Sequence, residues 1–384
     1  MKELTKILER TASRRSFLKN SMVAGAAATV GAGILGSGLP AFARPTSNSS
    51  SSALPKGDIA ILRFLAAAEL IESDLWTQYA ELGGIGSLPP VEVNPLEKLN
   101  PYQVALSNLD GDGPQYITSN TLDEVSHATF INAYLLSKGA EPVDLTPFQT
   151  LPGSTAKGAV PGKLRITNLT QLNVDTSWFV RYRSVGNPDL GATFPQAITL
   201  NNVTAIPRSN ADYKGASNPN FLGNDHIQAI ANVAAFHFGQ IEQGGSSLYA
   251  AMSQKVTHPE VLQITLGIGG DEVAHFLEWV DFAGNGVQPQ VAPFTDAVTG
   301  LTFPNFFSPL NPSIQPSLIF PVPFEFRPNL PNVAMIRPLT DPVAGARAAA
   351  AGFTASGLFI GQSAEFFDTL NNLAEAADQA QRGV

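Results

Sequence analysis

The segment Asp271-Glu272-Val273-Ala274-His275 has a near copy at Asp123-Glu124-Val125-Ser126-His127, and the two match at four of five positions. Residues three apart lie one above the other on a helix, so each Glu-x-x-His directs a carboxylate and an imidazole toward one point. The two glutamates lie 148 residues apart, each on a predicted helix. The repetition predicts a duplicated helix pair, in which each copy has a partner helix upstream.

Two upstream segments provide candidates for those partner helices. Glu69 and Glu72 precede the first copy, and Glu242 precedes the second. Each of these glutamates is followed by an aromatic residue seven positions later, so the spacing does not choose between Glu69 and Glu72. The aromatic residues are Trp76, Tyr79 and Tyr249. They lie about two turns along the same helix face, where they either adjoin the site or pack the helices.

The order Glu, Glu-x-x-His, Glu, Glu-x-x-His resembles the ferritin-like superfamily of di-iron and di-manganese carboxylate proteins. The resemblance implies a mainly α fold with a four-helix bundle over residues 58–284. It also implies two bound iron ions, with manganese as the alternative. Carried over by position, the metal ligands are Glu69 or Glu72, Glu124, His127, Glu242, Glu272 and His275.

Electrostatics supports a metal site independently of the resemblance. Four carboxylates that converge in an apolar bundle must take up protons or cations, because buried unpaired charge is costly. Two divalent cations balance four negative charges. Imidazole and carboxylate ligands suit iron, manganese or zinc, and the chain has no cysteine that would favour softer metals.

Apolar periodicity predicts four long helices. The first begins with Asp58 as its N-cap and ends near Leu82, and the second runs from about Leu122 to Ser137. Thr121 and Glu124 fit a capping box, which is the structural alternative to metal ligation for Glu124. The third helix runs from Asn224 or Asp225 to about Val256, and the fourth from Pro259 to Gly284.

Glycines surround the proposed ligands of the last two helices. They flank Glu242 and precede Glu272, and each costs about 1 kcal/mol in a helix interior. They mark either local unwinding or a close approach between helices. The glycines are Gly239, Gly244, Gly245, Gly267, Gly269 and Gly270.

Two regions depart from the helical pattern. Residues 142–222 form a large insertion between the second and third helices, with strand signals at 164–169 and 177–185. Residues 285–384 include ten prolines between Pro304 and Pro342, which predict an extended wrap over the bundle. Asp341-Pro342 then predicts the start of a fifth helix that runs to about Gln379.

The N-terminus resembles a twin-arginine signal peptide. Residues 1–43 contain Arg14-Arg15, an apolar run from Met22 to Leu39 and the small-x-small motif Ala41-Phe42-Ala43. A serine-rich linker follows at residues 44–57. These features predict export to the periplasm or the medium, without stable membrane insertion after cleavage. The alternative is a membrane anchor, but the run is rich in Gly and Ala.

Composition narrows the function classes. With 44% hydrophobic and 14% charged residues, the 384-residue chain has the composition of a folded protein. Residues 1–43 hold six Lys or Arg and two Glu, so their removal changes the formal net charge from −9 to −13. An acidic protein is a poor nucleic-acid binder. A serine or cysteine hydrolase is disfavoured because Cys and the Gly-x-Ser-x-Gly motif are absent.

Three functions remain. The first is an oxidoreductase whose two metals react with dioxygen or peroxide, with no catalytic residue assigned. The second is a metal-binding stress protein, since the chain is similar to exported ferritin-like proteins that include desiccation-related proteins. The third is a structural bundle without metal. A homo-oligomer is compatible with all three, whereas a hollow storage cage is not expected, because the insertion and tail would cover its packing faces.

Three further histidines complete the analysis. His237 lies five residues before Glu242 and is expected to be either a core residue or a residue that supports a ligand, rather than a seventh ligand. His226 and His258 stand at the starts of helices and are expected to be exposed.

Overall fold

The computed structural model describes residues 53–85, 99–178, 197–285, 291–305, 323, 327–334 and 345–383. The predicted signal peptide, the linker up to residue 52 and most of the proline-rich segment lie outside these residues. The described part confirms a mainly α fold. Its α-helices are α2 (Lys56–Gly83), α3 (Pro101–Leu109), α4 (Gly113–Ser137), α5 (Asp225–Ser253), α6 (Pro259–Asn285), α7 (Ala346–Ala355) and α8 (Ala364–Asp378).

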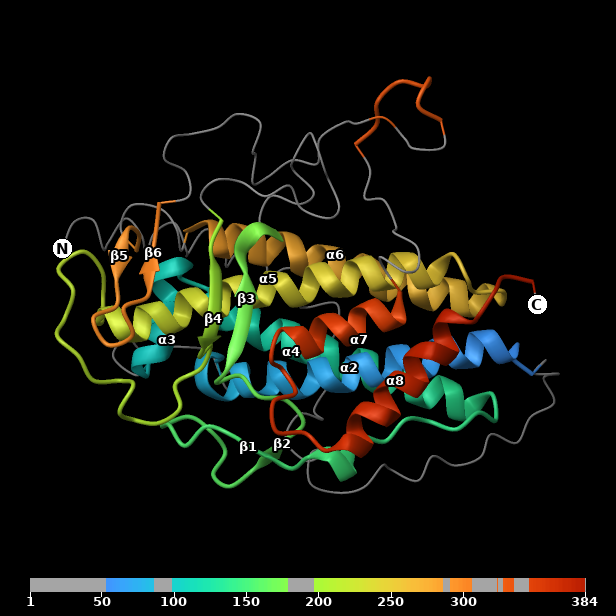
Figure 1. Ribbon diagram of the computed structural model, residues 1–384, viewed down its shortest axis with the longest axis horizontal. Coiled ribbons are helices and arrows are strands. Elements are labelled where there is room, and N and C mark those ends of the chain that lie inside the picture. The colour runs from blue at the N-terminus through green and yellow to red at the C-terminus, as the bar shows by residue number, and fades with distance from the viewer. Residues whose placement is uncertain are drawn as a thin grey trace, which may run out of the picture. The chain divides into compact units, whose positions relative to one another are not determined.

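The four longest described helices pack as two pairs. Helix α2 packs along α4, and α5 packs along α6. The helices of each pair run in opposite directions, and all four lie roughly parallel to one line (Figure 1). Their facing sides form one hydrophobic core. None of the described helices is long and apolar enough to cross a membrane.

The first of these helices begins earlier than its predicted cap. Helix α2 starts at Lys56, so Asp58 lies inside the first turn and the prediction of an N-cap at Asp58 is wrong. The Asp58 carboxylate instead accepts hydrogen bonds from the backbone N–H groups of Thr257 and His258, at 2.9 and 2.6 Å. Asp58 therefore ties the turn between α5 and α6 to the start of α2.

Helix α4 begins nine residues before its predicted start. Gly113 and Pro114 form its first turn, where proline is tolerated because it lacks an N–H that the helix would use. A segment rich in Gly and Pro is more often a loop than the start of a helix. Gly113 permits a close approach, since a Cβ there would lie 2.4 Å from the Phe282 ring.

The longer α4 overturns the capping-box alternative for Glu124. Thr121 and Glu124 lie in the middle of the helix, not at its start. The Thr121 hydroxyl donates to the carbonyls of Ile117 and Trp76, at 2.7 and 3.1 Å. The Glu124 side chain is therefore not required as a helix cap.

Helices α5 and α6 agree with their predicted bounds to within about three residues. The predicted start of α5 is confirmed, and Asn224 is its N-cap, because the Asn224 side chain accepts a hydrogen bond from the N–H of Ile227 at 3.1 Å. Both helices continue through their glycines without a break. Local unwinding is therefore wrong as an explanation for those glycines.

The insertion contains short antiparallel strand pairs. Strands β1 (Leu151–Pro152) and β2 (Leu164–Arg165) form one pair, and β3 (Leu172–Asp175) and β4 (Thr199–Val203) form another. The strand signal at 164–169 is confirmed in part by β2, whereas the signal at 177–185 lies mainly outside the described residues. A 3₁₀ turn at η2 (Thr146–Phe148) precedes β1.

The insertion is fixed to the bundle by buried polar contacts and by the β3–β4 pair, which lies across α5 (Figure 1). The Asp74 carboxylate of α2 accepts hydrogen bonds from the N–H groups of Ile166 and Thr167, at 3.0 and 2.9 Å. Gln78, one turn further along α2, donates to the Thr167 hydroxyl at 2.8 Å. These contacts hold the insertion along the side of α2.

The C-terminal region forms two described helices where one was expected. A turn separates α7 from α8, and Gly357 and Gly361 adopt φ values of +84° and +97° in it. Such positive φ values favour glycine and end a right-handed helix. Helix α8 packs on α2, and Phe366 and Leu370 are buried. Between α6 and α7, β5 (Phe294–Thr295) pairs with β6 (Thr302–Phe303).

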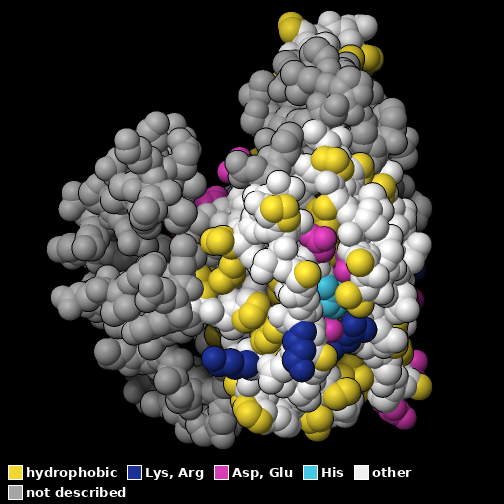
Figure 2. Space-filling view, turned by 90° about the vertical axis from the view of Figure 1, so that its left-hand side faces the viewer, with side chains coloured by type: hydrophobic (Ala, Val, Ile, Leu, Met, Phe, Trp, Pro, Cys, Tyr) yellow, Lys and Arg dark blue, Asp and Glu magenta, His cyan; other side chains and the backbone are white. Residues whose placement is uncertain are grey.

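Figure 2 shows one face of the molecule, at the left-hand side of Figure 1. On the described part of this face, hydrophobic side chains occur in small separate groups. A small group of Lys and Arg side chains lies close to Asp and Glu side chains. This face therefore presents no broad basic surface among the described residues.

Candidate metal centre

All seven residues predicted as candidate ligands are buried, and they converge between the two helix pairs. Glu124, Glu242 and Glu272 have no exposed surface, and His127 is the most exposed at 8%. Their ligand atoms fall into overlapping groups that could hold metal ions, with the atoms of each group within 4.8 Å of one another. The residues are Glu69, Glu72, Glu124, His127, Glu242, Glu272 and His275.

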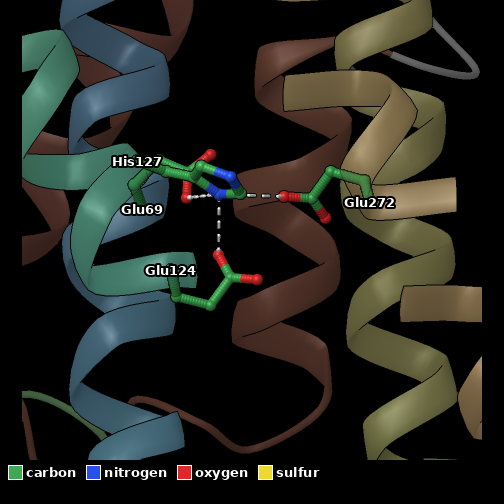
Figure 3. Close-up of side chains that lie close together, drawn as sticks. All are labelled: Glu69, Glu124, His127 and Glu272. Atoms are coloured by element: carbon green, nitrogen blue, oxygen red, sulfur yellow. Dashed lines mark ion pairs between the residues drawn. The ribbon is translucent and has the colours of Figure 1, made fainter. Parts of the chain in front are cut away.

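The first group is centred on the His127 imidazole (Figure 3). Its Nδ1 atom lies 3.4 Å from Glu69 Oε2, 3.5 Å from Glu124 Oε2 and 4.0 Å from Glu272 Oε1. Helices α2, α4 and α6 thus each contribute a carboxylate to the same nitrogen. Figure 3 shows the three carboxylates directed toward the imidazole from different sides.

The second group is centred on the His275 imidazole. Its Nδ1 atom lies 3.1 Å from Glu124 Oε1 and 3.3 Å from Glu242 Oε2. Glu124 therefore lies between the two histidines and belongs to both groups. A further group contains Glu72 with Glu124, Glu242 and Glu272. The structure thus brings both Glu69 and Glu72 to the site, although the sequence pattern required only one of them.

The two histidines are held by aspartates of the opposite repeat. His127 Nε2 lies 3.1 Å from Asp271 Oδ2, and His275 Nε2 lies 3.4 Å from Asp123 Oδ2. These aspartates were missed as functional residues, although both belong to the repeated segment. The signal was their presence in both copies, four residues before the histidine and so on the same helix face. Each contact leaves the Nδ1 atom directed at the carboxylates.

Two glutamates receive additional hydrogen bonds. The Tyr249 hydroxyl donates to Glu69 Oε1, which confirms that this aromatic residue adjoins the site. The Asn120 amide donates to Glu124 Oε1 at 3.0 Å, and Trp279 Nε1 donates to Asn120 Oδ1 at 2.6 Å. Asn120 and Trp279 were not predicted. The hydrogen-bond network of Glu124 therefore extends beyond the predicted ligand set, to Asn120 on α4 and Trp279 on α6.

Burial and mutual repulsion favour protons on the glutamates when no cation is present. Burial, followed by the charge of Glu242, raises the pKa of Glu124 to about 8. Burial and the charges of neighbouring glutamates also raise the pKa values of Glu72 and Glu272 well above their ordinary value. Carboxylates crowded in this way bind either protons or metal ions.

The histidines respond in the opposite way to their surroundings. Burial disfavours the charge on His127, but the hydrogen bond to Asp271 and the nearby carboxylates of Glu124 and Glu69 raise its pKa to about 12. Burial also disfavours the charge on His275, but Glu242, Asp123 and Glu124 raise its pKa well above the ordinary value. Each imidazole therefore carries a proton where a metal would otherwise supply positive charge.

Ligand atoms at the centre lack hydrogen-bond partners among the described residues. Nine buried atoms are in this state: one oxygen each on Glu69, Glu72 and Glu124, both on Glu242 and Glu272, and the Nδ1 atoms of both histidines. Buried polar atoms are normally paired, and each unpaired atom has a free-energy cost. Oxygen and imidazole nitrogen atoms in this arrangement fit a metal ion, which would satisfy them together.

One glycine provides the space for a ligand. A Cβ on Gly245 of α5 would lie 2.0 Å from Glu272 Oε2. Gly269 of α6 similarly admits Tyr249, whose Cβ would lie 2.7 Å from an added methyl carbon. Close approach is therefore the explanation for these two glycines. Gly244 and Gly267 face open space and have no such role.

The other histidines lie away from the centre. His237 is fully buried, as expected, and its Nδ1 atom lies 2.7 Å from the Tyr79 hydroxyl. The expectation that His226 is exposed is wrong: it is 5% exposed and bridges Asp296 and Asp212, at 2.9 and 3.3 Å. These carboxylates come from distant loops, which the sequence does not place beside α5. His258 is half-buried.

No protein-family model, curated protein or solved structure matches this chain. The geometry of the buried Glu and His residues therefore carries the functional inference.

Proposed function

We propose that this chain is a ferritin-like protein that binds a carboxylate-bridged pair of iron ions and uses them in redox chemistry with dioxygen or peroxide. Helices α2, α4, α5 and α6 are the four helices of that bundle. The observation that carries the proposal is the set of nine buried, unpaired oxygen and nitrogen atoms around Glu124. Iron suits this donor set, and manganese is the alternative.

The contacts suggest how the residues would divide between two ions. Glu69, Glu124, His127 and Glu272 would hold one ion, and Glu124, Glu242 and His275 would hold the other. Glu124 would be common to both. Glu72 lies with Glu124, Glu242 and Glu272 and would supply a further oxygen.

Charge balance favours metals that change oxidation state. Five buried glutamates carry a total charge of −5 when ionised. This value lies between the charge of two divalent ions and that of two trivalent ions, so the site suits both states about equally. Zinc has a single oxidation state and would use only one of them. Bound iron or manganese would supply electron transfer to or from the oxidant.

The chain's own residues hold the ligands in position. Asp271 and Asp123 orient the two imidazoles so that Nδ1 faces the glutamates. They also favour the tautomer that carries its proton on Nε2 and leaves Nδ1 free to bind a metal ion. The Tyr249 hydroxyl donates a hydrogen bond to Glu69 and so fixes the position of that carboxylate. The buried aromatic core around Trp76 and Trp279 excludes water from one side of the centre.

A surface groove offers a route for a small oxidant. It has a volume of about 440 Å³ and is lined by α4 and α6, with Phe130, Tyr134, Gly267 and Ile268 among its residues. Phe130 follows His127 by three residues, and Gly267 precedes Asp271 by four. The residues that line the groove therefore lie about one helical turn from His127 and Asp271.

Metal analysis tests the proposal. The exported chain, purified and reconstituted anaerobically with ferrous iron, should bind about two ions per chain. The Glu272→Gln variant keeps the shape of the side chain but removes its charge, and it should lose most of the metal. Glu375→Gln provides the matched control, because Glu375 is exposed on α8.

The outcomes separate the three candidate functions. Bound iron that is oxidised by peroxide or dioxygen supports the redox proposal. Bound metal without consumption of either oxidant would indicate a metal-binding stress protein. Full-length folded protein that binds no metal after reconstitution would contradict both and leave a structural bundle.

We also propose that the protein works in the periplasm or outside the cell after twin-arginine export. Residues 1–43 support this proposal through their paired arginines, apolar run and cleavage motif. Sequencing the N-terminus of exported protein tests it. A secreted chain that begins at Met1 would contradict it.

A further inference from the structure

A tryptophan is joined to the metal centre through one amide. Trp279 Nε1 donates to Asn120 Oδ1 at 2.6 Å, and the Asn120 amide donates to Glu124 Oε1 at 3.0 Å. Glu124 is the carboxylate shared by both histidine groups. Trp279 is fully buried, so these contacts are shielded from solvent.

A line of aromatic rings continues from Trp279 into the core. Trp279 stacks on Trp76 with ring centroids 5.3 Å apart and planes inclined by 21°. Trp76 in turn lies 5.6 Å from the Tyr79 ring. All three side chains have no exposed surface. Rings in contact at these distances allow an electron to pass between them without a bound carrier.

The line ends at a tyrosine with a base in contact. The Tyr79 hydroxyl lies 2.7 Å from His237 Nδ1. Burial lowers the pKa of His237 to about 3, so the imidazole is neutral. In the tautomer that carries its proton on Nε2, the Nδ1 atom accepts the phenolic hydrogen bond of Tyr79. The Nε2 atom has no hydrogen-bond partner among the described residues.

We propose that Trp279, Trp76 and Tyr79 form an electron path to the metal centre, with the Tyr79–His237 pair as its terminal electron donor. The inference rests on the proposed function, because hydrogen peroxide must first oxidise the bound iron. Tyr79 then loses one electron, and its phenolic proton moves to His237 Nδ1. The electron passes through Trp76 and Trp279 to the oxidised centre, where it would lower the oxidation state of one iron ion by one. The products are a neutral Tyr79 radical and a His237 imidazolium.

The hydrogen bonds decide where the oxidised state rests. Trp76 Nε1 has no hydrogen-bond partner among the described residues, and Trp279 Nε1 faces an amide oxygen, which is not a base. Neither oxidised tryptophan can transfer its proton. Oxidised Tyr79 can, because a phenol radical cation is a far stronger acid than an imidazolium. When an electron returns, the weak base His237 gives the proton back.

Electron paramagnetic resonance of the metal-loaded, full-length protein tests the path. Iron content is measured first, and the ferrous protein is then mixed with hydrogen peroxide and frozen during the reaction. A tyrosyl signal is expected in the native chain. It should be lost in Tyr79→Phe and in Trp76→Phe, whose phenylalanine rings resist oxidation.

Two further variants separate a redox role from a packing role. His237→Gln removes the base, so the signal should change from a tyrosyl to a tryptophanyl spectrum, which a loss of packing would not produce. Tyr102→Phe is the matched control, because Tyr102 is equally buried but its hydroxyl bonds the Ala205 carbonyl at 2.6 Å. The tyrosyl signal should remain in Tyr102→Phe.

The outcomes distinguish this inference from the proposed function. Iron that binds and is oxidised without any organic radical would overturn the path alone, as would a tyrosyl signal that persists in Tyr79→Phe. A chain that binds no iron would overturn both. Circular dichroism of each variant identifies any that fails to fold, and the spectral change in His237→Gln then decides the assignment.

Discussion

The Nε2 atom of His127 on α4 lies 3.1 Å from the Oδ2 atom of Asp271 on α6. The corresponding contact joins His275 of α6 to Asp123 of α4, with Nε2 and Oδ2 3.4 Å apart. Helices α4 and α6 come from opposite pairs, so each repeat orients the histidine of the other. The two groups of candidate ligands therefore depend on one another.

The first prediction concerns this contact. Asp271→Asn removes the charge that orients His127, and the metal affinity should fall about 10- to 100-fold, as is typical for residues that support a metal ligand. Competition with a chelator of known affinity measures the change. Asp281→Asn removes an exposed charge from the same helix and should have little effect. Equal losses in both variants would show that only the net charge matters.

The second prediction compares two adjacent glycines. Gly245→Ala should lower metal content, because the added Cβ would lie 2.0 Å from Glu272 Oε2. Gly244→Ala meets open space and should stabilise the fold by about 0.5–1 kcal/mol, because alanine favours the helix. Metal analysis and chemical denaturation measure the two effects. Unchanged metal content in Gly245→Ala would contradict the role assigned to this glycine.

The third prediction is that rising pH lowers the stability of the metal-free protein but strengthens the binding of metal. Without metal, the pKa of Glu124 is raised from 4.5 to about 8, so its contribution to stability is complete below pH 4.5 and is lost as pH rises to 8. Metal must displace these protons, so it binds more tightly as pH rises. The melting-temperature difference between manganese-loaded and metal-free protein should therefore widen across this window. A constant difference would contradict proton displacement.

The fourth prediction concerns the turn between α5 and α6. Asp58→Ala leaves the N–H groups of Thr257 and His258 without their acceptor and should cost about 1–3 kcal/mol. Urea denaturation of the metal-free protein measures this loss. Asp368→Ala removes an exposed carboxylate from α8 and serves as the control. A loss no larger than the control's would show that the turn is held by packing alone.

The sequence was sufficient to predict the long helices and the candidate ligands. Helical spacing places Glu124 and His127 on one face, and the repetition at Glu272 and His275 distinguishes them from isolated polar residues. Both the helical period and the repetition are patterns in the amino-acid sequence, so they can be recognised without a structure. The choice between Glu69 and Glu72 was not readable, because both occupy the same face of α2.

The missed features depend on contacts between distant segments or on exceptions to local rules. Tyr79 and His237 are 158 residues apart, and no spacing rule pairs them. Gly113 and Pro114 are residue types typical of loops, although the first turn of a helix accepts both. The break before α8 includes Gly357, where φ is positive and an added Cβ would lie 2.5 Å from the carbonyl oxygen of Gln171.

The reciprocal contacts between the two Asp-Glu-Val-x-His segments have a consequence for how such a site can arise. Two copies of one helix hairpin, related by a two-fold axis, would each give an aspartate to the other and receive one in return. A gene that encoded a single hairpin could therefore assemble the complete set of ligands as a homodimer. Tandem duplication and fusion would then join the copies, and the connecting segment would be free to lengthen without disturbing either half.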